Sequence, residues 1–353
     1  MIRWRRAVVT GVDREWRGSL EVHVTAADGE MFRALAYPGL VGRPEVGDEV
    51  LLSAAALELG LGTGGYALIV AIPARLPEDV PLQGHMVKAR YTPLQTVVDG
   101  AEERYPELAT ASSLDGMPVV VADLHSALPA VLAGILADRP SARVAYVMTD
   151  GGALPLWFSR TVDGLRSAGW LAAGTVTVGQ AFGGDLECVT VHSGLLAARH
   201  VLGADIAIVT QGPGNLGTGT EWGFSGVACG EAVNATAVLG GLPVAALRVS
   251  SADERERHRG VSHHSLTAYG KVALARAEVA LPDVDDAFWR EAAAQAAELE
   301  PRHAVVRVPV DGLDAALRSS PVKLSTMGRG LDQDHAAFLA SACAGRLAAT
   351  RKF

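Results

Sequence analysis

The chain lacks several features that would narrow its function at once. It has three cysteines in 353 residues, Cys188, Cys229 and Cys343, and none has the CxxC spacing of a zinc or redox motif. Such sparse thiols are typical of a reducing compartment, and we expect them to be buried as small apolar residues. No apolar run approaches the ~20 residues that a membrane-spanning helix needs. The sequence therefore predicts a cytoplasmic protein without a disulfide framework or a membrane partner.

Excess positive charge is also missing. The formal net charge is −8, which argues against a nucleic-acid partner because such proteins are normally basic. Arg3, Arg5 and Arg6 resemble the start of a signal peptide, but the charged residues 13–15 interrupt the apolar segment that should follow. We expect the first residues to form a β-strand.

The composition that is present, 49% hydrophobic with 39 glycines, is that of a globular protein long enough for two domains. Residues 1–75 contain short alternating apolar segments separated by turn signals, which predict a small all-β barrel. Residues 76–115 are predicted to be a linker with a connecting helix over 93–108. The five predicted strands of the barrel are Ala7–Val12, Ser19–Thr25, Met31–Tyr37, Glu49–Leu52 and Tyr66–Ala71.

Residues 116–353 show a different pattern, in which apolar runs of strand length alternate with helical stretches. This alternation predicts a Rossmann-like three-layer α/β domain with a mostly parallel sheet. A short extra strand is expected near Val189–Val191. The main strands are predicted at Pro118–Ala122, Arg143–Met148, Ala172–Val178, Ile206–Val209, Val244–Val249, Ala275–Ala280 and Ala304–Val308. The helices are predicted at residues 126–138, 155–168, 193–203, 221–239, 263–273, 285–299 and 333–350.

Polar or glycine-rich segments follow five of these strands, and ligands of open α/β sheets bind at that edge. The segment after Val209 contains Gly212, Gly214, Gly217, Thr218 and Gly219. These residues fit a loop that binds an anion or phosphate through backbone N–H groups, a dinucleotide site, or a tight packing turn. Pro213, the absence of a P-loop lysine and the absence of an acidic residue about 20 positions on weaken a nucleotide assignment.

The segment after Val249 carries most of the titratable side chains. Arg257 and Arg259 are candidates to neutralise an anion, whereas His258, His263 and His264 are candidates for acid–base catalysis. Ser262 is expected to be the N-cap of the next helix, which places two histidines in its first turn. Asp150 and Asp185 are candidates to orient a histidine. The alternative for the whole segment is a solvated charged surface.

Other candidate sites have weaker support. Histidines and aspartates at the strand ends are suitable metal ligands, but no HExxH or HxH spacing links them, so we assign no metal site and leave the cofactor unknown. These residues are Asp123, His125, Asp150, Asp185, His258, His263 and His264. His85, Lys88, Arg90 and Tyr91 form a further polar cluster. Ser225 is one residue short of the spacing of a nucleophile elbow.

Five segments together resemble an uncharacterised bacterial domain-of-unknown-function family of actinobacteria and firmicutes. They are ALELGLGTGGY (56–66), GHMVKARYTPLQ (84–95), GQAFGGDLE (179–187), QGPGNLGTGT (211–220) and RHRGVSHHSLTA (257–268). The resemblance implies a bacterial cytoplasmic protein and transfers no catalytic residue, because the family has no established activity.

We therefore expect an enzyme that acts on a small anionic metabolite, such as one bearing a phosphate group. In this hypothesis the glycines bind the anion, Arg257 and Arg259 neutralise it, and a histidine acts as acid or base. The alternatives are a non-catalytic metabolite sensor and a scaffold protein. A sheet of this size is compatible with a homodimer, although no sequence feature identifies its interface.

Overall fold

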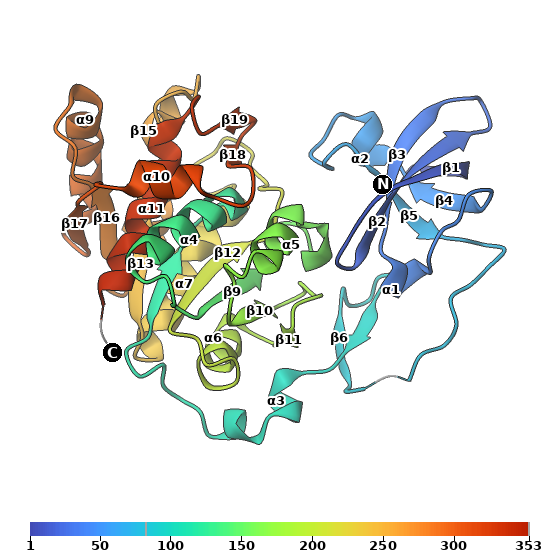
Figure 1. Cartoon of the computed structure of the whole chain (residues 1–353), viewed down its shortest axis with the longest axis horizontal. Helices are drawn as coiled ribbons and strands as arrows, with labels where there is room; N and C mark the ends of the chain where they lie inside the picture. The colour runs from blue at the N-terminus through green and yellow to red at the C-terminus, as the bar shows by residue number, and fades with distance from the viewer. Residues whose placement is uncertain (82, 352–353) are drawn as a thin grey trace. The chain divides into compact units, whose positions relative to one another are not determined.

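The computed structural model describes residues 1–81 and 83–351 and divides the chain into two compact units (Figure 1). The smaller unit contains Met1–Gln83 and Ala89–Val97, and the larger contains Gly84–Lys88 and the chain from Val98 onward. Residue 82 of the predicted linker and residues 352–353 of the predicted α/β domain lie outside the described residues. Each unit is described below by itself.

The smaller unit is a closed five-stranded barrel, as predicted. Its strand order is β1-β2-β3-β5-β4, and β3 and β5 are parallel while the other pairs are antiparallel. This is the strand order of the OB-fold, which hosts many functions and does not define one. The strands are β1 (Trp4–Trp16), β2 (Ser19–Ala26), β3 (Met31–Ala36), β4 (Glu49–Ser53) and β5 (Ala67–Ala71), with short helices α1 (Pro38–Val41) and α2 (Ala55–Glu58).

The helix predicted over residues 93–108 is wrong. The chain instead forms strand β7 (Thr96–Val98), helix α3 (Ala101–Arg104) and a 3-10 turn at Pro106–Ala109. Gly100 lies before α3 in extended conformation, and Pro106 restricts the residue that precedes it. These two residues prevent one continuous helix. Strand β6 (Met86–Lys88) precedes this region.

The larger unit contains an eight-stranded sheet in which every pair is parallel. The order is β11-β10-β9-β12-β8-β13-β16-β17. Strand β8 is buried along its whole length and β9 up to its last residue, which explains their apolar sequences. The strands are β8 (Pro118–Val121), β9 (Val144–Thr149), β10 (Gly174–Thr177), β11 (Leu186–Glu187), β12 (Ile206–Gln211), β13 (Leu242–Ala246), β16 (Glu278–Pro282) and β17 (Ala304–Val308). The extra strand predicted near Val189–Val191 is β11, which ends at Glu187, and Val191 instead begins a helix.

Helices cover both faces of this sheet (Figure 1). Helices α4 and α5 connect strands in one direction along the sheet and α6, α7, α8 and α9 in the other, so the right-handed rule for parallel connections assigns the two sets to opposite faces. Helices α10 and α11 pack with α4. Helices α4 and α11 approach closely because each has a glycine at the crossing. A β-carbon at Gly134 would lie 1.9 Å from the carbonyl oxygen of Ala342, and one at Gly345 would lie 2.0 Å from that of Val131. The helices are α4 (Leu128–Asp138), α5 (Arg160–Ser167), α6 (Val191–His200), α7 (Cys229–Val238), α8 (His263–Thr267), α9 (Ala287–Ala296), α10 (Leu313–Arg318) and α11 (His335–Thr350).

Two helix predictions need correction. The helix expected to begin near Glu221 is preceded by a 3-10 turn at Ser225–Ala228, and α7 itself begins at Cys229. The helix expected over 263–273 is α-helical only to Thr267 and continues as a π-helical turn over Ala268–Val272. All three cysteines are free and buried, as expected. Among the described helices, none combines the length and the apolar character needed to cross a membrane.

Candidate active site

The sheet topology creates a crevice at the carboxyl ends of β8 and β13. These strands are neighbours, but the chain leaves β8 toward β9 and leaves β13 toward β16, in opposite directions along the sheet. Such a switch point is where open α/β sheets bind ligands. Asp123 follows β8 and Arg248 follows β13, so both side chains belong to this crevice.

A small hairpin then places the histidines at the same edge. Strands β14 (Val249–Ser250) and β15 (Gly260–Val261) pair antiparallel, so the chain leaves the edge after Ser250 and returns to it at Ser262. The N–H of Ser262 donates to the carbonyl of Arg248 at 2.8 Å. Ser262 is the N-cap of α8, as predicted, and its hydroxyl accepts from the N–H of His264. We call residues 250–265 the histidine segment.

Three imidazoles of this segment form one cluster. The ring centroids lie 4.9 Å apart for His258 and His263, 4.9 Å for His258 and His264, and 4.5 Å for His263 and His264. His258 and His264 are buried, and His263 is half-buried. Phe224 stacks on His264 with a centroid distance of 3.7 Å, which fixes the plane of that ring. One nitrogen from each ring lies within 4.8 Å of one from each of the others.

The surroundings keep two of these rings neutral. Burial, followed by the positive charges of Arg248 and Arg255, lowers the pKa of His258 to about 3. Burial is also the largest cause of the lowered pKa of His263, and the charges of His264 and Arg257 add to it. Because imidazole binds protons or metals through a lone pair, a neutral ring is the form that can act as a base or a ligand.

Asp123 lies against the cluster, and one of its carboxylate oxygens is buried without a hydrogen-bond partner among the described residues. Its side chain is almost fully buried, and Oδ2 is 3.6 Å from Nδ1 of His264 and 3.7 Å from Nη1 of Arg248. Nη1 of Arg248 is in turn 3.0 Å from Nδ1 of His264. Among the described residues, Oδ2 has no hydrogen-bond partner, and the same is true of the buried Nε2 of His263. Buried polar atoms are normally paired, so two unpaired atoms beside one cluster make it a candidate site for a ligand.

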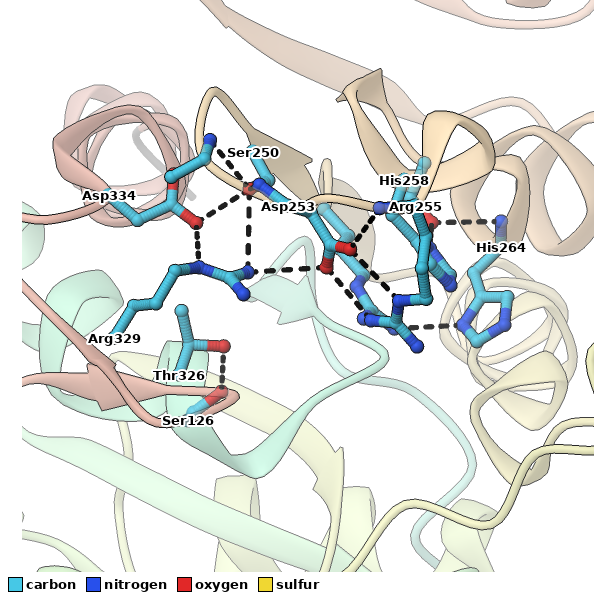
Figure 2. A network of polar contacts seen from close by, with 12 residues as sticks. Ser126, Ser250, Asp253, Arg255, His258, His264, Thr326, Arg329 and Asp334 are labelled. Carbon is cyan, nitrogen blue, oxygen red and sulfur yellow. Dashed lines mark hydrogen bonds and ion pairs between the residues drawn. The ribbon is translucent and has the colours of Figure 1, made fainter.

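A second polar network holds the histidine segment in place (Figure 2). Asp334 is fully buried before α11 and accepts hydrogen bonds from the Ser250 hydroxyl at 2.6 Å and from Nε of Arg329 at 3.0 Å. Arg329 also reaches Oδ2 of Asp253 at 3.2 Å, and Arg255 binds both oxygens of that carboxylate. Hydrogen bonding to Arg255 is the main reason that the pKa of Asp253 lies well below its usual range. The network therefore joins the hairpin to the start of the last helix.

This network borders a small cavity of about 30 Å³, which also reaches Asp123 and Arg248. That space holds about two water molecules, so it cannot accommodate a metabolite. A substrate would have to bind from the surface, where His263 is half-buried and Arg257 and Arg259 are exposed.

The glycine-rich segment, residues 212–224, lies beside the histidine segment, and we call it the glycine loop. Nη2 of Arg257 is 3.6 Å from the position of a β-carbon at Gly219, and Phe224 contacts His264. The loop does not open a helix; instead, residues 217 and 224 form a β-bridge. The glycine loop therefore contacts the histidine segment, but it lacks the strand–loop–helix arrangement of a nucleotide-binding fingerprint.

Several backbone donors of the glycine loop are already used within the protein. The N–H groups of Gly212, Leu216 and Thr218 donate to the Thr149 carbonyl, the Ser225 hydroxyl and the Gly223 carbonyl. Gly212 packs so tightly that a β-carbon would lie 2.5 Å from the carbonyl oxygen of Ala153. Gly214 and Gly219 have φ of 91° and 80°. Packing and turn geometry thus account for much of the glycine content, and fewer N–H groups remain for an anion than predicted.

The two aspartates predicted to orient a histidine have other partners. Oδ2 of Asp150 accepts from the N–H of Gln180 and so ties the loops that follow β9 and β10. Asp185 accepts from the N–H of Thr175 at 2.8 Å and pairs with Arg166. Thr175 is near the amino end of β10. Since β11 runs parallel to β10, the chain must return to the amino end of β10 before β11 begins, and Asp185 lies just before β11. Asp185 therefore lies at the opposite end of β10 from the ligand-binding edge.

Two other predicted candidates have structural roles. Lys88 is buried, and its ammonium group donates to the carbonyls of Thr177 and Ala181 and to Glu187. His125 contacts the Tyr146 hydroxyl at 3.0 Å and the Ser159 hydroxyl at 2.8 Å, and burial lowers its pKa to about 4. These partners occupy the functional groups of both side chains.

Sequence reasoning did not identify Arg248, Arg329 or Asp334 as members of the site. Arg248 offered a signal, because it is a charged residue inside the otherwise apolar run Val244–Val249. Asp334 and Arg329 offered none, since they meet the histidine segment only through the fold, some 80 residues further along the chain.

The fold and site together define a two-unit protein whose parallel α/β unit carries a histidine- and arginine-lined switch point. Residues 33–345 match the model of a family described as "Protein of unknown function (DUF3866)". The match covers most of the chain, and this protein belongs to that family. A search of curated proteins finds no match.

Proposed function

We propose that the larger unit is an enzyme that binds a small anionic molecule at the edge between the histidine segment and the glycine loop. The observation that supports this most directly is the convergence of three imidazoles at the switch point of the sheet, with arginines beside them. Imidazole and guanidinium groups at such a place suit the binding and conversion of an anion.

The proposed binding surface is the exposed side of the cluster. His263 is half-buried there, Arg257 is exposed beside Gly219, and Arg259 is exposed two residues further on. Arg257 provides a fork of N–H donors for a carboxylate or phosphate group. His263 provides the group that contacts the reacting part of the substrate. Arg248 and Asp123 contact His264 from the buried side and hold the cluster in position.

A thermal-shift screen of carboxylate- and phosphate-bearing metabolites tests this proposal. A ligand present at about 100 times its Kd stabilises the native state by about 2.7 kcal/mol and should raise the Tm by roughly 5 °C. The shift should disappear in Arg257→Ala. It should persist in Arg290→Ala, which removes an exposed arginine of α9 that pairs with Asp285.

The same screen can overturn the proposal in two ways. If a ligand stabilises Arg257→Ala as strongly as the unmodified protein, the anion does not bind at this surface. If a bound ligand is recovered chemically unchanged after long incubation, with and without added divalent metal, the protein is a sensor rather than an enzyme.

A further inference from the structure

We propose that His258, His263 and His264 together bind a divalent transition-metal ion, most suitably Zn²⁺. No spacing motif in the sequence indicates such a site, because two of the ligands are adjacent and the third is five residues earlier. The fold brings them together through the return of the β14–β15 hairpin and the first turn of α8. The inference deepens the proposed function and depends on it only for the catalytic use of the metal.

The geometry of the three rings is close to that of a metal site. Their candidate nitrogens lie within 4.8 Å of one another. In a tetrahedral site with Zn–N distances of about 2.0–2.1 Å, ligand nitrogens are about 3.4 Å apart. Metal binding therefore requires the rings to approach by up to about 1.4 Å. Three imidazoles would occupy three of the four coordination positions of the metal and leave the fourth open to water or to an anionic substrate.

The hydrogen bonds of the rings leave one nitrogen of each available. Nδ1 of His258 is 2.7 Å from the Ser262 hydroxyl, and Nδ1 of His264 lies beside Asp123 and Arg248. Nε2 of His263 is buried without a hydrogen-bond partner among the described residues. Nε2 is thus the ligand atom that this arrangement favours in His258 and His263. In His264 the guanidinium of Arg248 donates to Nδ1, so metal binding through Nε2 requires the ring proton to move to Nδ1, where Asp123 Oδ2 at 3.6 Å is the acceptor within reach.

Asp123 is the residue that makes the site electrostatically reasonable. Arg248 lies against the cluster, and Arg255 and Arg257 act on it from the histidine segment, so the neighbouring guanidiniums oppose a dication. The buried carboxylate of Asp123 is placed 3.6 Å from Nδ1 of His264 and provides compensating charge. A carboxylate behind a metal-binding histidine orients the ring and increases its basicity. Asp123 is therefore a positioning residue and not a ligand.

The test is metal binding by the full chain produced without a polyhistidine tag. After treatment with chelator and removal of the chelator, the protein is titrated with Zn²⁺ in a calorimeter and with Co²⁺ in a spectrophotometer. We expect one equivalent of either ion per chain and the intense visible absorption of four-coordinate Co²⁺. His263→Ala should abolish tight binding, and Asp123→Asn should weaken it by about 10- to 100-fold without changing the stoichiometry.

His200→Ala is the matched control, because His200 is exposed and its Nε2 contacts the Ser113 carbonyl. It should bind metal as the unmodified protein does. Circular dichroism of each variant establishes that it is folded, and the unmodified protein's stoichiometry and Co²⁺ spectrum do not depend on any variant. Binding of less than one equivalent, or unchanged binding in a folded His263→Ala, would overturn the inference.

A thermal-shift arm with inorganic phosphate separates this inference from the proposed function. If phosphate stabilises the protein through Arg257 but no metal binds, the metal inference is wrong and anion binding survives. If one equivalent of metal binds but neither phosphate nor any metabolite of the screen stabilises the protein, the metal site stands and the proposed function fails.

Discussion

The glycine loop and the histidine segment leave the same edge of the sheet and meet where Phe224 stacks on His264, yet their residues serve different purposes. Residues 214–223 of the glycine loop are mostly exposed, and the N–H groups of Gly212, Leu216 and Thr218 bond within the protein. The histidine segment buries His258 and His264, and Nε2 of His263 is buried without a hydrogen-bond partner among the described residues. The comparison teaches that glycine content marks close packing at Gly212 and turn geometry at Gly214 and Gly219, whereas the candidate chemistry lies with the clustered imidazoles.

The largest effect should come from removing the carboxylate behind the histidine segment. Asp123→Ala leaves the nearly buried Arg248 without its counter-charge, and such losses cost about 3 kcal/mol or more. Urea denaturation measures the change. Asp285→Ala, which breaks an exposed pair with Arg290, should cost less than about 0.5 kcal/mol. Equal losses in the two variants would mean that Asp123 is not coupled to the cluster.

His125 extends the comparison to a histidine that lies outside both the glycine loop and the histidine segment. Its pKa is about 4 in the folded protein and about 6.5 when unfolded, so the unfolded state binds the proton more readily. Its contribution to stability is present above pH 6.5 and is lost as the pH falls toward 4, by roughly 2–3 kcal/mol. Unfolding free energies measured across this range should fall less steeply in His125→Gln. The exposed His192→Gln variant should follow the unmodified protein, and parallel curves for all three would contradict the assignment.

Substitution by alanine should affect stability differently at two glycines of the glycine loop. A β-carbon at Gly212 meets the Ala153 carbonyl, so Gly212→Ala should destabilise the protein by about 2 kcal/mol. Gly217 has its nearest neighbours at 3.9 Å, so Gly217→Ala should be neutral or stabilise by up to about 1 kcal/mol. Thermal unfolding compares them directly. Strong destabilisation by Gly217→Ala would show that the loop's outer part is packed as tightly as its base.

The smallest effect should come from the N-cap of α8. Ser262→Ala removes the bond from the His264 N–H and the contact with His258, and should cost about 1–2 kcal/mol. The exposed Ser319→Ala variant should change stability by less than about 0.5 kcal/mol. If Ser262→Ala is equally harmless, the cap does not hold the histidines in place.

The strands of both units could be predicted from the sequence because their apolar patterns have the period of the structure they form. The five barrel segments alternate, and β8 and β9 are continuously apolar and buried on both faces. Helix boundaries were less predictable. The glycine loop was assigned in part to α7, although residues 217–224 pair with each other before that helix begins.

The candidate site was predictable only where its residues are close in sequence. His258, His263 and His264 lie in one segment, and Ser262 is a recognisable N-cap. Asp185 was misplaced, because a sequence does not show that the chain turns back after β10 and reaches its amino end. Asp334 and Arg329 meet the histidine segment through tertiary structure alone, which no local pattern reports.

The close approach of Gly134 and Gly345 has a consequence for the order of events during folding. Helix α4 follows the first strand of the sheet, and α11, its closest partner, is separated from it by about 200 residues. A contact so distant along the chain closes slowly. Until the ribosome has made α11, the apolar surface of α4 has no permanent cover. The α/β unit therefore cannot complete its core until α11 is available, and the nascent chain should be prone to aggregate before α11 emerges.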